Sequence, residues 1–302
     1  MKYGITRLVL GCQQFIELTS DEYGAAKQAK VSLVTALGIE EKFNLVLENY
    51  AELELELQER TTRHLLFQDH DWSSFMDDLY AINRRLANLL SAARLYIDQV
   101  KHDVSGLFGA DSEQFKELEK ALAEQYDAHR EYRVLEALRN HMQHRSLPVH
   151  NLAYNIVRDT REQVTLAKHT CTPSMSVTRI EEQGSFKAQV LQELKGGDDL
   201  VGLMPFVRQY VASIGQVHKG LRERMGKAVA SWDAQIESIQ EKFREVCGDH
   251  FAGLDVVRKD DQGAVMESSH ILEDIVTRRR ALEKKNGSVP HLPTHYISTE
   301  AP

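Results

Sequence analysis

The residues best suited to chemistry lie between His129 and His150, where the sequence reads HREYRVLEALRNHMQHRSLPVH. This stretch holds four of the thirteen histidines and four arginines of an otherwise acidic chain. Histidine can accept and release protons near neutral pH, and the planar guanidinium of arginine can hold two phosphate oxygens. These two residue types could cleave RNA without a metal, because the reaction needs a base for the 2′-hydroxyl, positive charge for the phosphorane and an acid for the leaving oxygen.

The centre of this stretch, RNHMQH at residues 139–144, resembles the signature of the HEPN superfamily, an arginine and a polar residue followed by a histidine. Many members are metal-independent endoribonucleases, some of them toxins or defence effectors, and their cleft usually forms at a two-fold dimer interface. The resemblance implies that Arg139 clamps phosphate, that His144 transfers protons and that Asn140 either orients one of them or binds phosphate. It covers the motif and the helices before it, roughly the first half of the chain. With the LPV that follows, the motif also resembles an uncharacterised bacterial helical family.

Two features of the motif keep a second interpretation open. Some toxin members carry a tyrosine two residues after the histidine, where this chain has Ser146. Arg139 and His144 project about 140° apart on a straight helix, so they converge only if the helix ends or distorts, or if a second copy completes the site. The competing interpretation is a solvated, charged helix end. On the catalytic interpretation, the additional substrate contacts are His129, Arg133, His141 and Arg145.

The composition excludes several other kinds of site. A net charge of −8 over 302 residues leaves no global basic surface, so any RNA contact must be local. Cys12, Cys171 and Cys247 are few and far apart, which argues against a disulfide framework or a zinc site and fits a reducing cytoplasm. The longest apolar run is too short to span a membrane. The sequence therefore predicts a cytoplasmic protein without a metal, a cofactor or a membrane contact.

Hydrophobic spacing predicts a mainly α protein, a bundle of long helices with a small antiparallel sheet or hairpins. The residues at 3–18 could form a strand or a short helix. Helices are predicted over 25–37 and over 40–65, separated at Gly38. The alternating AELELELQ segment is assigned to the second of them because its residues are strong helix formers. The next long helix is predicted to begin at a capping box that starts with Ser74.

A third long helix is predicted from Asp111, and its apolar stripe changes face near residues 130–134. Its first half buries apolar side chains on one face, and the same face becomes polar when it is continued at 100° per residue. Either the helix bends there, or its second half docks its other side on a new partner or simply faces solvent. The polar face consists of His129, Arg133, Glu136, Asn140 and His144.

After Pro148 the spacing favours short strands, and the sequence predicts a small β segment over 149–182, ending with SMSVTRIEE. A short helix over 185–195 follows, and then a long helix over 207–246 with near-heptad spacing. That helix could pack inside the bundle or form a dimer seam. A hairpin around a DDQG turn precedes the last helix, predicted over 270–285.

These elements divide the chain into four parts. They are a HEPN-like helical bundle at 1–148, the β segment at 149–182, a long helix, hairpin and final helix at 183–285, and an irregular tail at 286–302. The clustered arginine, asparagine and histidine side chains predict a cytoplasmic, homodimeric HEPN-like ribonuclease that binds RNA. The acidic balance and the near-heptad helix favour the alternative, a non-catalytic scaffold that binds a protein partner through its long amphipathic helices.

Overall fold

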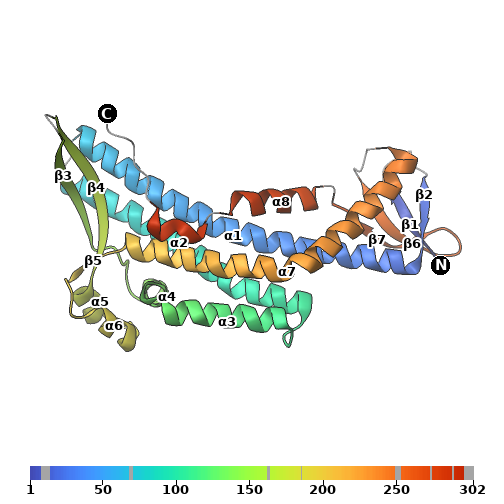
Figure 1. Ribbon diagram of the computed structural model, residues 1–302, viewed down its shortest axis with the longest axis horizontal. Coiled ribbons are helices and arrows are strands. Elements are labelled where there is room, and N and C mark those ends of the chain that lie inside the picture. Colours follow the sequence, from blue (N-terminus) through green and yellow to red (C-terminus); the bar gives the residue numbers. More distant parts are fainter. Residues whose placement is uncertain are drawn as a thin grey trace. The chain divides into compact units, whose positions relative to one another are not determined.

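The computed structural model describes residues 1–7, 14–67, 71–161, 164–184, 186–248, 253–272, 274–287 and 289–295. The protein is mainly helical with two small antiparallel sheets, as the sequence predicts (Figure 1). It divides into two compact units, each assembled from separate stretches of the chain. Unit 1 contains Met1–Glu41, Asp103–Gln114 and Leu221–Gly287, and unit 2 contains Lys42–His102, Phe115–Gly220 and Ser288–Pro302. The boundaries predicted from the sequence, at residues 148, 182 and 285, divide the chain into consecutive segments instead, and they stay a prediction.

Three long helices contribute residues to both units. They are α1 (Ser20–Phe67), α2 (Trp72–Phe108) and α7 (Met204–Cys247). The AELELELQ segment is helical, and α7 confirms the predicted near-heptad helix. The predicted break at Gly38 is wrong, because α1 runs through it. A glycine inside a helix costs about 1 kcal/mol relative to alanine, which the buried residues of the flanking turns offset.

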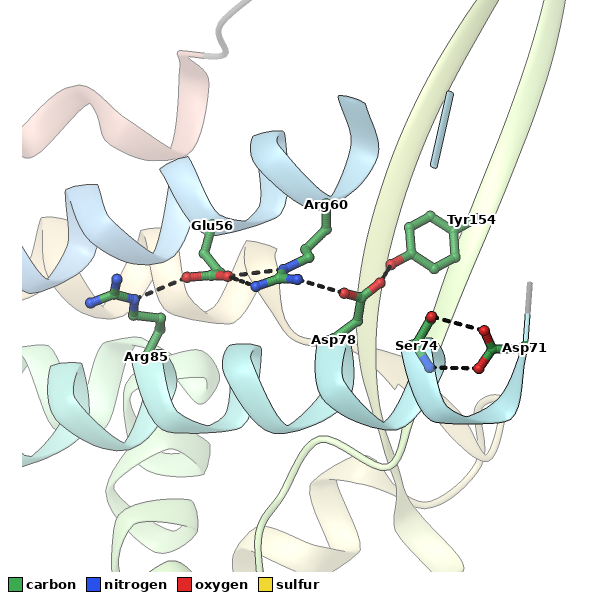
Figure 2. A network of polar contacts seen from close by, with 7 residues as sticks. All are labelled: Glu56, Arg60, Asp71, Ser74, Asp78, Arg85 and Tyr154. Atoms are coloured by element: carbon green, nitrogen blue, oxygen red, sulfur yellow. Dashed lines mark hydrogen bonds and ion pairs between the residues drawn. The ribbon is translucent and has the colours of Figure 1, made fainter. Parts of the chain in front are cut away.

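The start of α2 differs from the prediction by one turn. The Asp71 carboxylate accepts hydrogen bonds from the Ser74 backbone N–H at 3.0 Å and from the Ser74 hydroxyl at 3.1 Å (Figure 2). Asp71 is therefore the cap, and Ser74 lies inside the first turn. The helix continues past Gly106 and ends before Gly109, whose φ of 92° suits a glycine.

The predicted third helix is two helices, α3 (Glu113–Ala128) and α4 (Arg130–His144). They are separated at His129, whose φ of −117° and ψ of 110° are extended. The predicted bend is confirmed, and it explains why the apolar stripe changes face. The buried residues are Leu118 and Leu122 of α3 and Tyr132, Val134, Leu135, Ala137, Leu138 and His141 of α4.

Unit 1 contains a four-stranded antiparallel sheet of order β2–β1–β6–β7. Its strands are β1 (Lys2–Arg7), β2 (Phe15–Leu18), β6 (Leu254–Lys259) and β7 (Val265–His270). The strand alternative for residues 3–18 is confirmed at 3–7 and 15–18, which belong to β1 and β2, while residues 8–13 lie outside the described ranges. The hairpin around DDQG is also confirmed, and Gly263 in its turn has a φ of 88°. The last helix, α8 (Ile275–Lys285), begins later than predicted because His270 still belongs to β7.

The core of unit 1 lies between this sheet and the adjoining parts of α1, α7 and α8. Apolar side chains from all of them form one cluster, which includes Ile5, Leu33, Ile239, Phe243, Val256 and Ile275. A buried ion pair borders it, in which Arg279 of α8 donates to Asp233 of α7 at 2.5 Å. The side chains of Arg279 and Asp233 are only 4% and 6% exposed, respectively.

Unit 2 contains a three-stranded antiparallel sheet of order β3–β4–β5. The strands are β3 (Asn151–Arg161), β4 (Val164–Ser176) and β5 (Leu200–Gly202), of which β3 and β4 form a long hairpin (Figure 1). The predicted strand SMSVTRIEE is wrong beyond Ser176, because α5 (Val177–Gln183) begins there. The Ser176 hydroxyl caps it by accepting from the Arg179 N–H at 3.2 Å. The predicted short helix is α6 (Ala188–Leu194).

The core of unit 2 is aromatic where α1, α2, α4 and α7 meet. Phe43 of α1 contacts Tyr96 of α2, and Tyr132 of α4 contacts Tyr210 of α7, with ring centroids 5.7 and 4.9 Å apart. His218 of α7 lies 2.8 Å from the Tyr96 hydroxyl and is buried in this core. The seam of α7 therefore packs within the bundle here.

Several predictions concern the ends of the described ranges. The tail predicted at 286–302 includes a short 3₁₀ helix, η1 (Val289–Thr294). Its residues 288 and 296–302 lie outside the described residues. Cys12 also lies outside them. Over the ranges given above, no helix combines the length and the apolar character that crossing a membrane requires.

The start of α1 carries a capping box formed by Thr19 and Glu22. The Thr19 N–H donates to the Glu22 carboxylate at 2.8 Å, and the Glu22 N–H donates to the Thr19 hydroxyl at 3.2 Å. Lys242 of α7 pairs with the same carboxylate. The hydrogen bond from Lys242, followed by those from Thr19, lowers the pKa of Glu22 from 4.5 to about 2.

We expect the free energy of unfolding to fall as the pH is lowered from about 4.5 toward about 2, because the unfolded chain then binds the Glu22 proton more tightly than the folded chain. Urea denaturation at a series of pH values should show a shallower fall for Glu22→Gln. The matched control Glu17→Gln, on exposed β2 surface, should keep the wild-type slope. Equal slopes for all three proteins would contradict this expectation.

Candidate functional site

The motif residues occupy the last turns of α4, in unit 2. The Arg139 Nη1 donates to the Asn140 Oδ1 at 3.0 Å, so the structure brings these two predicted site residues into contact. Asn140 is exposed and Arg139 is half-buried. The Arg139 Nε is shielded from solvent and has no hydrogen-bond partner in the described part of the chain. Within the described ranges, the guanidinium is thus held by a neutral amide and by no carboxylate.

His144 is the last residue of α4, and its side chain is exposed. The helix closes after it, where the Arg145 backbone N–H donates to the His141 carbonyl at 2.8 Å. Among the described residues, no hydrogen bond or ion pair holds the His144 ring. α4 stays helical between Arg139 and His144, so the structure does not bring these two side chains together within one copy.

His141 is the buried member of the motif, with 0% of its surface exposed. Its Nε2 lies 2.9 Å from the Gln183 Oε1 and 3.2 Å from the Ser146 Oγ. The amide oxygen of Gln183 can only accept, so the His141 Nε2 donates to it, and in the neutral ring the Nδ1 is then an acceptor. That Nδ1 is buried without a partner in the part of the protein that the structure describes.

His150 lies on the other side of Pro148 from His141 in the sequence. The Ser176 backbone N–H donates to the His150 Nδ1 at 3.0 Å, so the Nε2 of the neutral ring carries the proton. This Nε2 is also buried and has no partner among the described residues. Burial lowers the pKa of His150, and the charge of Arg179 and that of His141 when it is protonated lower it further, against the opposing charge of Asp199. These effects favour the neutral ring of His150.

Other cations near the motif differ in how they are held. Arg145 and Arg179 are exposed, and neither has a carboxylate partner within the described ranges. Arg133 instead pairs with Glu193 at 2.8 Å and donates to two backbone carbonyls at 2.7 and 2.8 Å. Arg133 therefore joins α4 to the α6 region, whereas His129 marks the break between α3 and α4. Two arginines beside the motif remain available to an anion.

A chain of ion pairs fixes the base of the β3–β4 hairpin on α1 and α2 (Figure 2). Arg85 pairs with Glu56 at 3.2 Å, Glu56 pairs with Arg60, and Arg60 pairs with Asp78 at 2.9 Å. The Tyr154 hydroxyl of β3 donates to the Asp78 carboxylate at 2.5 Å. Burial alone would raise the pKa of Glu56, but Arg60 and Arg85 hold it below its ordinary value. Every charge in this chain is matched, which is typical of a structural role.

Asn83 of α2 fastens the segment that follows the motif. Its Oδ1 accepts from the Val149 N–H and its Nδ2 donates to the Val149 carbonyl, both at 3.0 Å. Asn83 is 2% exposed and Val149 is buried, so this double hydrogen bond is shielded from water. The segment between His144 and His150 is thereby fixed to α2 at Val149.

Sequence reasoning gave no role in the site to Ser146, His150, Arg179 and Gln183. Ser146 and His150 lie within the stretch from His129 to His150, so the sequence does mark their region. Arg179 and Gln183 come from α5, and the predicted strand SMSVTRIEE covers Arg179 but ends one residue before Gln183. Among the described residues, no three histidine, cysteine or carboxylate side chains are grouped to hold a metal ion.

No protein-family model, no curated protein and no solved structure matches this chain. The resemblance to the HEPN superfamily therefore depends on the motif residues 139–144 and on the helices that precede them.

Proposed function

We propose that the chain is a metal-independent endoribonuclease of the HEPN type, with its site at the C-terminal end of α4. One observation carries the proposal. Asn140 holds the guanidinium of Arg139 without neutralising it, and one turn later His144 exposes a ring that no described residue holds. A positioned cation and an available imidazole are the two groups that metal-free cleavage of RNA requires.

The proposed reaction uses the 2′-hydroxyl of RNA as the nucleophile. Arg139 binds two non-bridging phosphate oxygens, and Asn140 keeps its guanidinium in place. The 2′-oxygen attacks phosphorus, loses its proton to a base and displaces the 5′-oxygen, which takes a proton from an acid. His144 transfers one of these protons. The products are a 2′,3′-cyclic phosphate and a 5′-hydroxyl.

The proposed enzyme is a homodimer, because one copy does not bring its own Arg139 and His144 together. The two side chains project about 140° apart on a helix that is regular between them. A two-fold axis at the ends of two α4 helices would place Arg139 of one copy beside His144 of the other.

Single-turnover cleavage of a mixed RNA pool in EDTA tests this proposal. We expect the wild type to cleave, and we expect Arg139→Ala and His144→Ala to be slower by a factor of about 100 or more. Circular dichroism should show that both variants are folded. Arg84→Ala is a matched control, because Arg84 is an exposed helical arginine without an ion pair in the described structure, and it should keep the wild-type rate.

Mixing the two inactive variants tests the shared site. Half of the dimers in an equal mixture contain one copy of each variant, and one of their two sites then has both Arg139 and His144. We therefore expect about a quarter of the wild-type activity to return on mixing. No recovery would place the whole site within one copy, and cleavage that survives both substitutions would overturn the site assignment.

A scaffold function is the second candidate, and exposed apolar side chains favour it. They lie where α1 ends and α2 begins, in unit 2, and they include Leu66, Phe67, Trp72, Met76 and Tyr80. Trp72 is 74% exposed, which is unusual for so large a side chain. A wild-type protein that does not cleave RNA at any concentration would favour this candidate over the enzyme.

A further inference from the structure

Exposed apolar side chains gather where α1 ends and α2 begins, in unit 2. Three of them, Trp72, Met76 and Tyr80, are four residues apart and therefore lie along one face of α2, over a length of about 12 Å. Leu66 and Phe67, in the last turn of α1, are exposed at the same end of the helix pair. These five side chains form the apolar patch.

The apolar patch is large enough to join two proteins. Its aromatic side chains, Phe67, Trp72 and Tyr80, are 65%, 74% and 63% exposed. An aromatic side chain offers about 150–250 Å², so the three together expose roughly 300–500 Å² on each copy. With Leu66 and Met76 added, two copies that cover the patch with each other bury about 1,000 Å², which is the area that a specific interface needs.

The homodimer proposed above needs apolar area of this kind. The end of α4 exposes mainly polar and charged side chains, among them Asn140, His144 and Arg145. Two copies that meet there bring the positive charges of their arginines together, and like charges across an interface oppose association. Most of the free energy of association therefore has to come from another surface, and burial of apolar area is the usual source.

The apolar patch and the motif belong to the same part of unit 2. Asn83, three residues after Tyr80 on α2, forms two hydrogen bonds of 3.0 Å with Val149. Residues three apart are neighbours on a helix surface, so the Tyr80 end of the patch adjoins the segment that follows the motif. Val149 is only five residues after His144. An interface that covers the patch can therefore continue to the end of α4.

We propose that the apolar patch binds the same patch of a second copy of this chain, with the two α2 helices packed antiparallel about a two-fold axis. The choice of partner rests on the proposed ribonuclease function, which requires a second copy. A two-fold axis at Met76 sets Trp72 of each copy against Tyr80 of the other, because each lies four residues from Met76. Tryptophan, tyrosine and methionine are enriched at protein interfaces, and aromatic side chains attract each other beyond their buried area.

Sedimentation velocity of the full chain without RNA is the first test. We expect wild type to pass from monomer to dimer between about 1 and 100 μM, and Trp72→Ser and Tyr80→Ser each to weaken the dimer about tenfold or more. The matched control is Leu95→Ser, which changes an exposed apolar residue of the same helix about 22 Å beyond Tyr80. Its dissociation constant should equal that of the wild type, and circular dichroism should show that all variants are folded.

Two results of this measurement would overturn the proposal. A wild type that stays monomeric at about 100 μM would exclude a second copy as the partner and leave the patch to a different protein. A dimer that Trp72→Ser and Tyr80→Ser weaken no more than Leu95→Ser does would place the interface elsewhere.

A spectroscopic measurement locates the interface without changing the patch. Labelling with 5-fluorotryptophan marks Trp72 and Trp232, the two tryptophans of the chain, and a Trp72→Phe variant assigns their signals. We expect the ¹⁹F signal of Trp72 to shift with protein concentration over the range in which the dimer forms. The signal of Trp232, which stacks on Phe108 in unit 1, should stay constant. A dimer that forms without moving the Trp72 signal would overturn the proposal.

These measurements contain no RNA, so the interface and the enzyme can fail separately. A dimer that depends on Trp72 in a protein that does not cleave RNA supports the interface and removes the ribonuclease function. If the protein does cleave, Trp72→Ser should be slower than wild type at a concentration where only the wild type is dimeric. Equal rates under that condition would show that the patch does not join the two copies of the enzyme, and would overturn the inference while the ribonuclease function stands.

Discussion

Replacing Asp233 with alanine should lower the free energy of unfolding by about 3–5 kcal/mol, because the change leaves the buried guanidinium of Arg279 without its main partner. The two side chains are 2.5 Å apart and almost fully buried. Glu283 also pairs with Arg279, but its side chain is 34% exposed and compensates a buried charge less well. Urea denaturation followed by the fluorescence of Trp232, which stacks on Phe108 within unit 1, measures the effect.

Arg280→Ala is the matched control for this substitution. Arg280 donates to the same Asp233 carboxylate at 2.9 Å, but its side chain is 53% exposed. An exposed ion pair contributes about 0.2–1 kcal/mol, so this variant should remain close to the wild type. A Trp72→Phe background removes the fluorescence of unit 2, since the chain has only two tryptophans. Equal effects of Asp233→Ala and Arg280→Ala would show that burial of the pair does not matter.

Asn83→Ala should destabilise unit 2 by about 2–4 kcal/mol, because it leaves the buried N–H and carbonyl of Val149 without partners. The same change releases the segment that follows the motif. Native-state hydrogen exchange should therefore show rapid exchange of the Val149 amide in the variant and protection in the wild type.

The matched control for Asn83→Ala is Asn155→Ala, on the exposed part of β3. Among the described residues, the side chain of Asn155 donates only to the Ala153 carbonyl, at 3.4 Å, so its removal should change stability by less than about 0.5 kcal/mol. Protection of the Val149 amide that persists in Asn83→Ala would mean that another group holds this segment.

The long helices could be predicted from the sequence because their buried residues repeat every three or four positions. The same spacing indicated a bend near His129, because the buried side of the predicted helix changes there. Two predictions are wrong because a short segment does not show what packs around it. Gly38 does not end α1, because packing on both sides overrides its low helix propensity, and SMSVTRIEE does not continue as a strand, because Ser176 caps a helix. The Thr19–Glu22 capping box is a local pattern that the sequence alone could have indicated.

The candidate site could be predicted only in part, because its contacts join distant parts of the chain. Arg139 and Asn140 are adjacent in sequence, so their contact is local. His141 lies three residues after the buried Leu138, and this spacing could have indicated that its ring points inward. Its partner Gln183 is 42 residues away. Nothing in a single sequence marks such a pairing, because the fold alone brings the two residues together.

The register of β1 has a consequence for the timing of synthesis. Gly4 pairs with Val257, so β1 leaves the ribosome about 250 residues before the strand that it needs on one side. At about 5–20 residues per second, this strand waits about 12–50 seconds with only β2 beside it. An unpaired strand edge is a template for association with other chains. Slow translation or a high concentration of nascent chains should therefore favour aggregation through β1, and rapid completion of β6 should protect the protein from it.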